Sequence, residues 1–283
     1  MLRWEFGRRR LEWESAPRVR LVGVVNVTPD SFSDGGRFLS TEAAVAHGLA
    51  LVAAGATLLD IGGESTRPGS LPVPAEAERL RVVPVLRALR DRTDVPLSID
   101  TTKPEVAAAA LEAGAEIIND IHALANSEMA ALAARAGAGV ILMHMRGTPA
   151  TMHLGDLSAP DVVGLVVEAL AEAMERACAA GVAPEALCLD PGIGFGKTAE
   201  QSVALVAGLP RLAALGRPVL LGPSRKSFLG ALTGRPVDER VAATVAVSAC
   251  ATLLGVHLLR VHDVGEVRDA VRVATAIAEA RAA

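Results

Sequence analysis

The chain has 283 residues, of which 51% are hydrophobic, and this supplies enough apolar surface for one large core. Its formal net charge is −4 at pH 7, so the basic face that a nucleic-acid partner requires is not expected. No apolar run reaches the roughly 18 residues of a membrane helix, and the first residues lack a signal peptide's apolar core. We therefore expect a cytoplasmic protein without a membrane or nucleic-acid partner, in which Cys178, Cys188 and Cys250 are buried free thiols.

The first predicted element is a β-hairpin. Residues 2–6 and 10–14 are short strand-like runs around Gly7, and we expect them to plug one end of the fold. From residue 21 onward, short β-branched runs alternate with longer segments rich in Ala, Leu, Glu and Arg. The predicted strands cover residues 21–27, 57–61, 96–100, 116–120, 139–144, 187–190, 218–222 and 257–261. The predicted helices cover residues 41–54, 75–91, 104–113, 127–136, 160–180, 199–214, 238–254 and 263–281.

These successive β-α units predict a closed (β/α)8 TIM barrel with its helices on the outside. An open doubly wound sheet is the alternative, but it usually has fewer strands and gathers its ligand residues at one switch point. Here a polar residue ends nearly every strand, which favours the closed barrel. Because no linker interrupts the chain, we predict one domain over residues 1–283, with the hairpin in residues 1–18 and the barrel in residues 19–283.

The polar strand ends are the candidate site, because the carboxyl ends of all barrel strands meet at one rim. A single polar residue after a strand is commonly a cap or a turn former, but a nearly complete ring favours a binding site. Its acids and amides suit a flat, amide-like heterocycle, and its later members include bases. In chain order the ring consists of Asn26, Asp60, Asp100, Asn119, Asp120, His144, Asp190, residues 224–226, Arg260 and His262.

The loop after the first strand, residues 26–36, has the sequence NVTPDSFSDGG. Asn26, together with Asp30 or Asp34, offers the oxygen ligands that suit Mg²⁺, an ion that prefers few protein ligands plus phosphate oxygens. Phe32 stands among polar neighbours, as in a mobile lid that closes on a substrate, although a solvated surface loop has a similar composition.

Two other loops carry hydroxyls and bases. The loop at residues 62–70, GGESTRPGS, contains Thr66 and Arg67, and it is either a second lid or a surface loop. The segment at residues 222–228, GPSRKSF, places two bases and two hydroxyls at a predicted helix start, which favours a phosphate or carboxylate.

Lysine is rare in this chain. Of the 28 Lys and Arg residues, only Lys103, Lys197 and Lys226 are lysines, and each closely follows a predicted strand. A lysine in a chain that otherwise uses arginine indicates a position where a compact ammonium is needed and a guanidinium would not serve, although chance is the alternative. For Lys103 and Lys197 the sequence suggests no role.

Taken together, the motifs resemble the dihydropteroate synthase family of pterin-binding TIM barrels. The resemblance runs from about residue 20 to the C-terminus in the family's motif order. Besides the three loop segments quoted above, the matching strings are SIDTTK at 98–103, IND at 118–120, MHMRGTP at 143–149, LDPGIGFGKT at 189–198 and RVHDV at 260–264. The departures are His122, where a small residue is expected, and Ile193, which replaces a frequent Phe.

The resemblance implies a transferase of folate biosynthesis that is a homodimer and a sulfonamide target. It would condense 6-hydroxymethyl-7,8-dihydropterin diphosphate with 4-aminobenzoate to give 7,8-dihydropteroate and diphosphate. Because the aniline nitrogen is neutral and a dihydropterin ring can delocalise positive charge, our hypothesis for this reaction is a dissociative, SN1-like displacement. One alternative is a pterin-dependent methyltransferase, which also binds pterin with Asp and Asn but has no need of the anion-binding segment at residues 224–227. The other is a non-catalytic pterin-binding paralogue, and the intact first and second loops argue against it.

The resemblance also implies roles for individual residues. The polar edge of the pterin would be bound by Asp100, Asn119, Asp190 and Lys226, and its faces would lie near Met143, Phe195 and Arg260. The diphosphate would be held by Asn26, Thr66, Arg260 and His262, with Mg²⁺ at Asn26. The aminobenzoate would be enclosed by Phe32, Arg67, Pro68 and Ser227. The residues implied as catalytic are Asp100, Lys226, Arg260 and His262.

Overall fold

The computed structural model describes residues 1–13, 18–28, 37–66 and 69–282. Its centre is an eight-stranded parallel sheet with the strand order β8-β7-β6-β5-β4-β3-β10-β9. The outermost strands meet through a bridge between Leu189 and Val219, and the Leu189 amide donates to the Pro218 carbonyl over 2.8 Å. The predicted barrel is therefore confirmed. The strands are β3 (Arg20–Asn26), β4 (Leu58–Gly62), β5 (Leu97–Asp100), β6 (Ile117–Asp120), β7 (Gly139–Met143), β8 (Leu187–Asp190), β9 (Leu220–Leu221) and β10 (Leu258–Val261).

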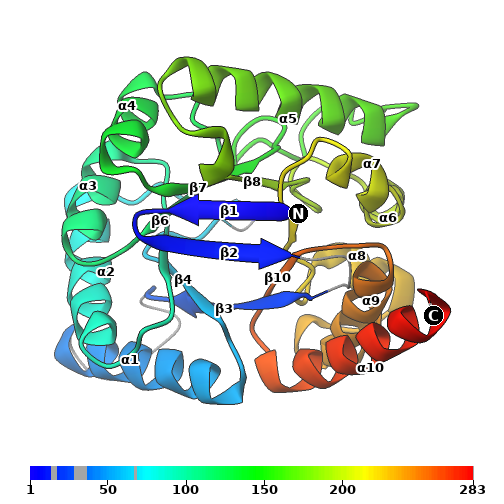
Figure 1. Cartoon of the computed structure of the whole chain (residues 1–283), viewed down its shortest axis with the longest axis horizontal. Coiled ribbons are helices and arrows are strands. Elements are labelled where there is room, and N and C mark those ends of the chain that lie inside the picture. Colours follow the sequence, from blue (N-terminus) through cyan, green and yellow to red (C-terminus); the bar gives the residue numbers. More distant parts are fainter. Residues whose placement is uncertain (14–17, 29–36, 67–68, 283) are drawn as a thin grey trace.

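Helices surround the barrel on all sides (Figure 1). They are α1 (Arg37–Ala54), α2 (Ala75–Arg90), α3 (Pro104–Glu112), α4 (Ser127–Ala136), α5 (Val162–Ala179), α6 (Ala199–Ala207), α7 (Leu209–Ala213), α8 (Ser227–Thr233), α9 (Val241–Leu253) and α10 (Val264–Ala282). No helix in the described part of the chain is long and apolar enough to cross a membrane. Cys178, Cys188 and Cys250 are free thiols, as predicted, but only Cys188 is buried, whereas Cys178 is half-buried and Cys250 is exposed.

Some predicted helix boundaries are wrong. The segment predicted as one helix over 199–214 is two helices, α6 and α7, that meet at Gly208, with Pro210 in the first turn of the second. A proline inside a helix removes a backbone donor, so the break falls where the chain loses that hydrogen bond. The predicted helix over 238–254 begins with a separate 3-10 turn, η3 (Val237–Glu239), before α9.

Alternate residues of each strand point to opposite faces, and this divides the interior into two cores. Outward-facing residues such as Leu59 and Ile118 pack under the helices in the larger apolar cluster. Inward-facing residues fill the amino-terminal end of the barrel: Val22, Leu58, Ile117, Ile141, Cys188, Leu220 and Leu258. The next inward position on each strand, two residues later, therefore lies nearer the carboxyl rim.

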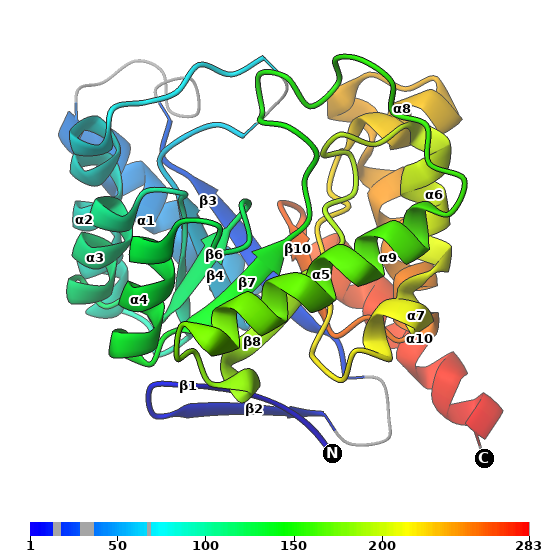
Figure 2. The same ribbon diagram turned by 90° about the horizontal axis from the view of Figure 1, so that it is seen from above.

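The amino-terminal hairpin closes the bottom of the barrel, as predicted. Its strands β1 (Leu2–Phe6) and β2 (Arg9–Trp13) are antiparallel, and they lie across the end opposite the β7–α5 loop (Figure 2). Trp4, Phe6 and Trp13 are buried against the inward-facing apolar layer. The Trp4 indole also donates to the Ala186 carbonyl over 2.8 Å in the turn η2 (Pro184–Ala186).

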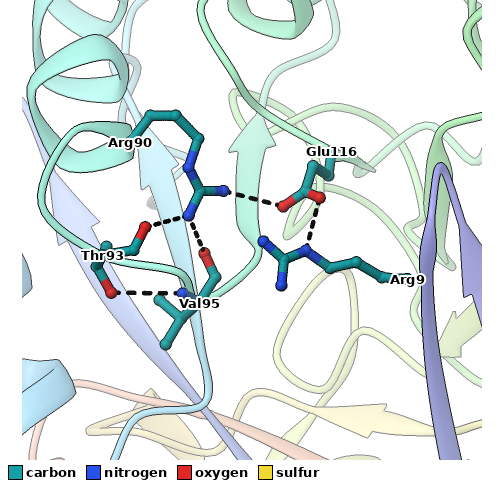
Figure 3. A network of polar contacts seen from close by, with 5 residues as sticks. All are labelled: Arg9, Arg90, Thr93, Val95 and Glu116. Carbon is teal, nitrogen blue, oxygen red and sulfur yellow. Dashed lines mark hydrogen bonds and ion pairs between the residues drawn. The ribbon is translucent and has the colours of Figure 1, made fainter.

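Glu116 joins this hairpin to the barrel (Figure 3). One carboxylate oxygen accepts from Arg9 Nε of the hairpin over 2.6 Å, and the other accepts from Arg90 Nη1 at the end of α2 over 3.1 Å. Arg90 also donates to the Thr93 and Val95 carbonyls. One acid therefore holds two arginines from distant parts of the chain.

We expect Glu116→Gln to lower the free energy of unfolding by about 1–2 kcal/mol, because the amide keeps the side-chain shape but loses two partly buried ion pairs. Urea denaturation measures this change. Glu112→Gln, at an exposed residue of α3, is the matched control and should leave stability within about 0.5 kcal/mol. Equal stability of the two variants would contradict a structural role for the Glu116 bridge.

Candidate active site

A cavity opens at the carboxyl rim of the barrel. Its lining residues are Val24, Thr66, Asp100, Asn119, Ile121, Met143, Asp190, Gly192, Ile193, Phe195, Gly222, Ser224, Lys226, Arg260 and His262. Strand alternation explains this set, since Asn119, Met143 and Asp190 each stand two residues after an inward-facing residue of the apolar layer. The rim of the barrel thus carries polar groups directly above its apolar interior.

Most of the predicted site residues meet in this cavity. They are Thr66, Asp100, Asn119, Met143, Asp190, Phe195, Lys226, Arg260 and His262. Ser227 is not among the lining residues; it is exposed at the first position of α8. Asn26 is half-buried at the end of β3, opposite Gly62 of β4. Five predicted positions lie outside the described residues, namely Asp30, Phe32, Asp34, Arg67 and Pro68.

A charged cluster forms the floor of the cavity. Arg260 donates from Nε to Asp60 Oδ2 over 2.6 Å and from Nη2 to Asp100 Oδ2 over 2.8 Å. Asn119 Nδ2 donates to the same Asp60 oxygen over 3.0 Å. This bond fixes the orientation of the Asn119 side-chain amide, including its carbonyl oxygen. Asp60 is completely buried, and its carboxylate orients both the Arg260 guanidinium and the Asn119 amide.

The electrostatics of this cluster follow from its burial. Burial raises the pKa of Asp100 to about 7, although the nearby Arg260 guanidinium lowers it, and the neighbouring Asp60 carboxylate raises it. Burial lowers the pKa of Arg260, but the two carboxylates outweigh burial and raise it above its ordinary value. The arginine is therefore a permanent cation, whereas Asp100 changes charge near neutral pH.

Lys226 and Phe195 also line the cavity. Lys226 Nζ lies 3.9 Å from the centroid of the Phe195 ring. Burial lowers the pKa of Lys226 to about 8, opposed by the Asp190 carboxylate. Burial raises the pKa of Asp190, while the Gly192 amide, which donates to Asp190 Oδ1 over 2.7 Å, lowers it. Gly192 has φ +62°, and a β-carbon there would lie 2.0 Å from the His144 carbonyl oxygen, so only glycine fits.

Ser224 and His262 lie at the end of the cavity formed by the last two units. Ser224 Oγ accepts from the His262 amide over 3.2 Å and lies 2.9 Å from its Nδ1. The second base of this segment does not line the cavity. Arg225, with φ +56°, makes a two-bond ion pair with Asp263 at 3.0 and 2.6 Å. Of the two bases predicted for an anion, only Lys226 faces the cavity.

A second cavity adjoins the first and shares Thr66, Asp100 and Ile121 with it. Lys103 lines this neighbour, where its ammonium donates to Glu64 and to the buried Glu78. These contacts tie the loop after β4 to α2 and to the loop after β5. Lys103 is thus engaged by two acids.

Sequence reasoning placed Asp60 in the ring without giving it a role, and it placed Asp120 there wrongly. Strand alternation is the signal that separates them. Asp60 stands two residues after the inward-facing Leu58 and therefore also points inward, whereas Asp120 directly follows the inward-facing Asn119 and therefore points outward. The Asp120 carboxylate accepts from the His122 and Leu124 amides, both over 2.9 Å, and shapes the turn after β6.

Comparison with known proteins places this site in a family. The family model described as "Pterin binding enzyme" matches residues 22–262, so the class is a pterin-binding enzyme on a (β/α)8 barrel. Dihydropteroate synthase of Mycobacterium leprae is 47% identical over 262 residues, which are 90% of this chain and 92% of that protein. The chain belongs to the dihydropteroate synthase family, as the motifs predicted.

Two solved structures support the same assignment. Dihydropteroate synthase of Xanthomonas albilineans with 4-aminobenzoic acid has 50% sequence identity and a TM-score of 0.87, over 92% of this chain and 93% of that chain. The enzyme of Burkholderia cenocepacia complexed with 7,8-dihydropteroate has 43% sequence identity and a TM-score of 0.89, over 100% of this chain and 99% of that chain. The similarity covers the hairpin as well as the barrel.

Proposed function

We propose that the chain is a cytoplasmic dihydropteroate synthase of folate biosynthesis. It joins 6-hydroxymethyl-7,8-dihydropterin diphosphate to 4-aminobenzoate and releases 7,8-dihydropteroate and diphosphate. The observation that carries the proposal is a single cavity with a carboxylate-and-amide wall beside a cluster of bases, in a chain of this family.

The pterin binds at the wall formed by the middle strands. A pterin edge presents N–H donors and a carbonyl acceptor, which match the carboxylates of Asp100 and Asp190, the amide of Asn119 and the ammonium of Lys226. The Phe195 ring and the Met143 side chain provide apolar surfaces for the flat ring. All of these groups line the same cavity, which supports their binding one ligand together.

The diphosphate lies toward the last two units. Arg260 and His262 face this part of the cavity with the hydroxyls of Thr66 and Ser224, and together they offer a cation and several donors to phosphate oxygens. The Asn26 amide oxygen fits Mg²⁺, because this ion accepts a single protein ligand beside phosphate oxygens and waters. When bound, Mg²⁺ neutralises charge on the leaving diphosphate. The parts of the chain that the structure describes contain no group of three or more His, Cys, Asp and Glu residues suited to a metal.

The aminobenzoate binds beside the first and second loops. Ser227 stands exposed next to Lys226, where it contacts the second substrate from α8. The family resemblance assigns contacts with the aminobenzoate to Phe32, Arg67 and Pro68, which lie outside the described residues. Sulfonamides, as mimics of aminobenzoate, are expected to compete at this position.

The difficult step of the reaction is the departure of diphosphate, not the activation of the nucleophile. The aniline nitrogen of aminobenzoate is neutral at pH 7 and needs no strong base. The C–O bond breaks first, diphosphate leaves with the electron pair, and the dihydropterin ring delocalises the positive charge. Asp100 or Asp190 stabilises that cation, while Arg260 and His262 stabilise the anion. The amine then forms the new C–N bond and loses a proton to solvent.

This order of steps makes a prediction. We expect the enzyme with Mg²⁺ and the pterin diphosphate alone to cleave the C–O bond slowly and release diphosphate. Quenched reactions followed by chromatography of the pterin and diphosphate measure the cleavage. Strict dependence of cleavage on the amine would contradict a dissociative step.

Among the groups that line the cavity, Asp100 and Lys226 should make the activity depend on pH. Binding of the pterin requires ionised Asp100 and protonated Lys226, whose pKa values are about 7 and about 8. We therefore expect kcat/KM for the pterin diphosphate to rise with pH through about 7 and to fall above about 8. Lys226→Arg, whose guanidinium stays charged, should remove the fall at high pH, and an unchanged fall in that variant would assign it to another group.

Diphosphate release tests the proposed function. Wild-type enzyme mixed with both substrates and Mg²⁺ should produce diphosphate and dihydropteroate in equal amounts. A pterin-dependent methyltransferase would bind pterin without releasing diphosphate, and a non-catalytic paralogue would bind it without turnover. Either result would replace the proposal.

We also propose that the chain is a homodimer whose interface includes exposed apolar side chains of its last elements. Large hydrophobic side chains are exposed on α8 (Leu232), η3 (Val237), α9 (Leu253) and α10 (Val273 and Ile277). Exposed apolar side chains that gather on one face are typical of an interface between protein chains. Analytical ultracentrifugation should give twice the 29.1 kDa mass of the chain, and a monomer at micromolar concentration would exclude this surface as a stable interface.

A further inference from the structure

Lys197 is a buried lysine that the proposed reaction does not use. Its side chain is 3% exposed, and it is not among the residues that line the cavity. Its ammonium nitrogen donates to three backbone carbonyls, those of His144 over 3.0 Å, Gly192 over 2.9 Å and Phe195 over 3.0 Å. Three donors thus meet three acceptors, which is the full donor capacity of a lysine.

These carbonyls belong to the wall against which the pterin is proposed to bind. Gly192 and Phe195 line the cavity in the loop between β8 and α6, and His144 follows β7. The amide of Gly192 orients the Asp190 carboxylate over 2.7 Å, and the Phe195 ring faces Lys226. The ammonium of Lys197 therefore holds, from behind, the backbone that positions two pterin-contacting side chains.

A tetrahedral ammonium suits these three acceptors. It directs three bonds to converging carbonyls, whereas a guanidinium is a planar fork and needs more room. One of these carbonyls is already closely packed, since a β-carbon on Gly192 would lie 2.0 Å from the His144 oxygen. This accounts for a lysine in a chain that otherwise uses arginine.

The surrounding charges are mixed. Burial lowers the pKa of Lys197 to about 7, the Asp190 carboxylate raises it, and Lys226 and Arg146 lower it. The neighbouring His144 is held neutral, because burial and the Lys197 charge lower its pKa to about 3. The three carbonyl dipoles favour the protonated lysine at this position.

We propose that Lys197 is a positioning residue for pterin binding. Without touching the pterin, it ties the β8–α6 loop to the end of β7 and so fixes the Asp190 carboxylate and the Phe195 ring. This inference rests on the proposed function. It gives Lys197 a role in the same site as Lys226.

The test compares Lys197→Met, Lys197→Gln and Lys197→Arg with wild type. We expect the Kd of the pterin diphosphate, measured by titration calorimetry, to rise about tenfold or more in Lys197→Met and Lys197→Arg, because buried carbonyls lose their donors or are displaced. The KM for aminobenzoate should change less than about twofold, since that substrate binds away from this loop. Lys197→Gln, whose amide keeps two donors, provides a milder variant should Lys197→Met fail to fold.

Ser202→Ala is the matched control. Its buried hydroxyl donates to the Thr198 carbonyl in α6 over 2.8 Å, so its loss affects stability near the same loop without touching residues 192–195. A Kd near the wild-type value in Lys197→Met or Lys197→Gln, with Tm lowered as in the control, would show a structural role only and overturn the inference. Full pterin affinity in Lys197→Arg would overturn the three-carbonyl geometry. Failure of wild type to bind the pterin diphosphate would instead refute the proposed function.

Discussion

Replacement of Arg260 by Met is expected to lower kcat/KM for the pterin diphosphate by about 10³-fold or more. The variant loses a cation proposed to stabilise the departing diphosphate, and such donors are commonly worth about 10²–10³ in rate. It also leaves the Asp60 and Asp100 carboxylates without the guanidinium that bonds both. An acid buried without its partner costs about 3–5 kcal/mol of stability, so Tm should fall as well.

Arg260→Lys separates the two effects. It keeps a positive charge but loses the fork that reaches Asp60 and Asp100 together, so its kcat/KM should lie between those of wild type and Arg260→Met. Arg90→Met, which breaks a pair at the opposite end of the barrel, controls for loss of an arginine and should retain wild-type kcat/KM. Steady-state assays and thermal melts measure both quantities, and an Arg260→Met enzyme within about threefold of wild type would remove Arg260 from the reaction.

Asp190→Ala and Lys226→Ala are each expected to weaken pterin binding by about 2–3 kcal/mol, which is about 30- to 150-fold in Kd. Each removes a charged hydrogen-bonding partner of the ring from a buried wall. Because each carries a charge that shifts the other's pKa, the double variant should lose less than the sum of the two single losses.

Asp161→Ala is the acid control for this pair. Asp161 is exposed at the start of α5, where it pairs with Arg211, and its loss should leave pterin affinity unchanged. Titration calorimetry with the pterin diphosphate gives the Kd of the wild type and of each of the four variants. Wild-type affinity in Asp190→Ala or Lys226→Ala would exclude that side chain from the pterin edge.

Much of this fold could be predicted because its signals are local. The strands are short apolar runs, most of which have a polar residue at or just after their end, and the helices between them are rich in Ala, Leu, Glu and Arg. The hairpin was predicted from a single glycine between two strand-like runs, and its packing on the barrel bottom follows from Trp4 and Trp13. Helix ends were less predictable, as at Gly208, where Pro210 divides one apolar pattern into two helices.

The site could be predicted only in part, because its contacts join distant residues. Asp60 gains its role through a bond to Arg260, which lies 200 positions away in the sequence. Arg225 is adjacent to Lys226, yet its left-handed backbone and its ion pair with Asp263 direct it away from the cavity. No local pattern distinguishes two adjacent bases that point in different directions. The sequence marks Lys197 as one of only three lysines, but its three carbonyl partners come together only in the folded chain.

A crystal structure of this chain with 7,8-dihydropteroate tests whether the rim cavity is the pterin site. The pterin ring should lie against Phe195, with its polar edge within hydrogen-bonding distance of Asp100, Asn119 and Asp190 and of the Lys226 ammonium. A pterin ring in the neighbouring cavity beside Lys103 would contradict the assignment, because the residues proposed to bind it would then face an empty site.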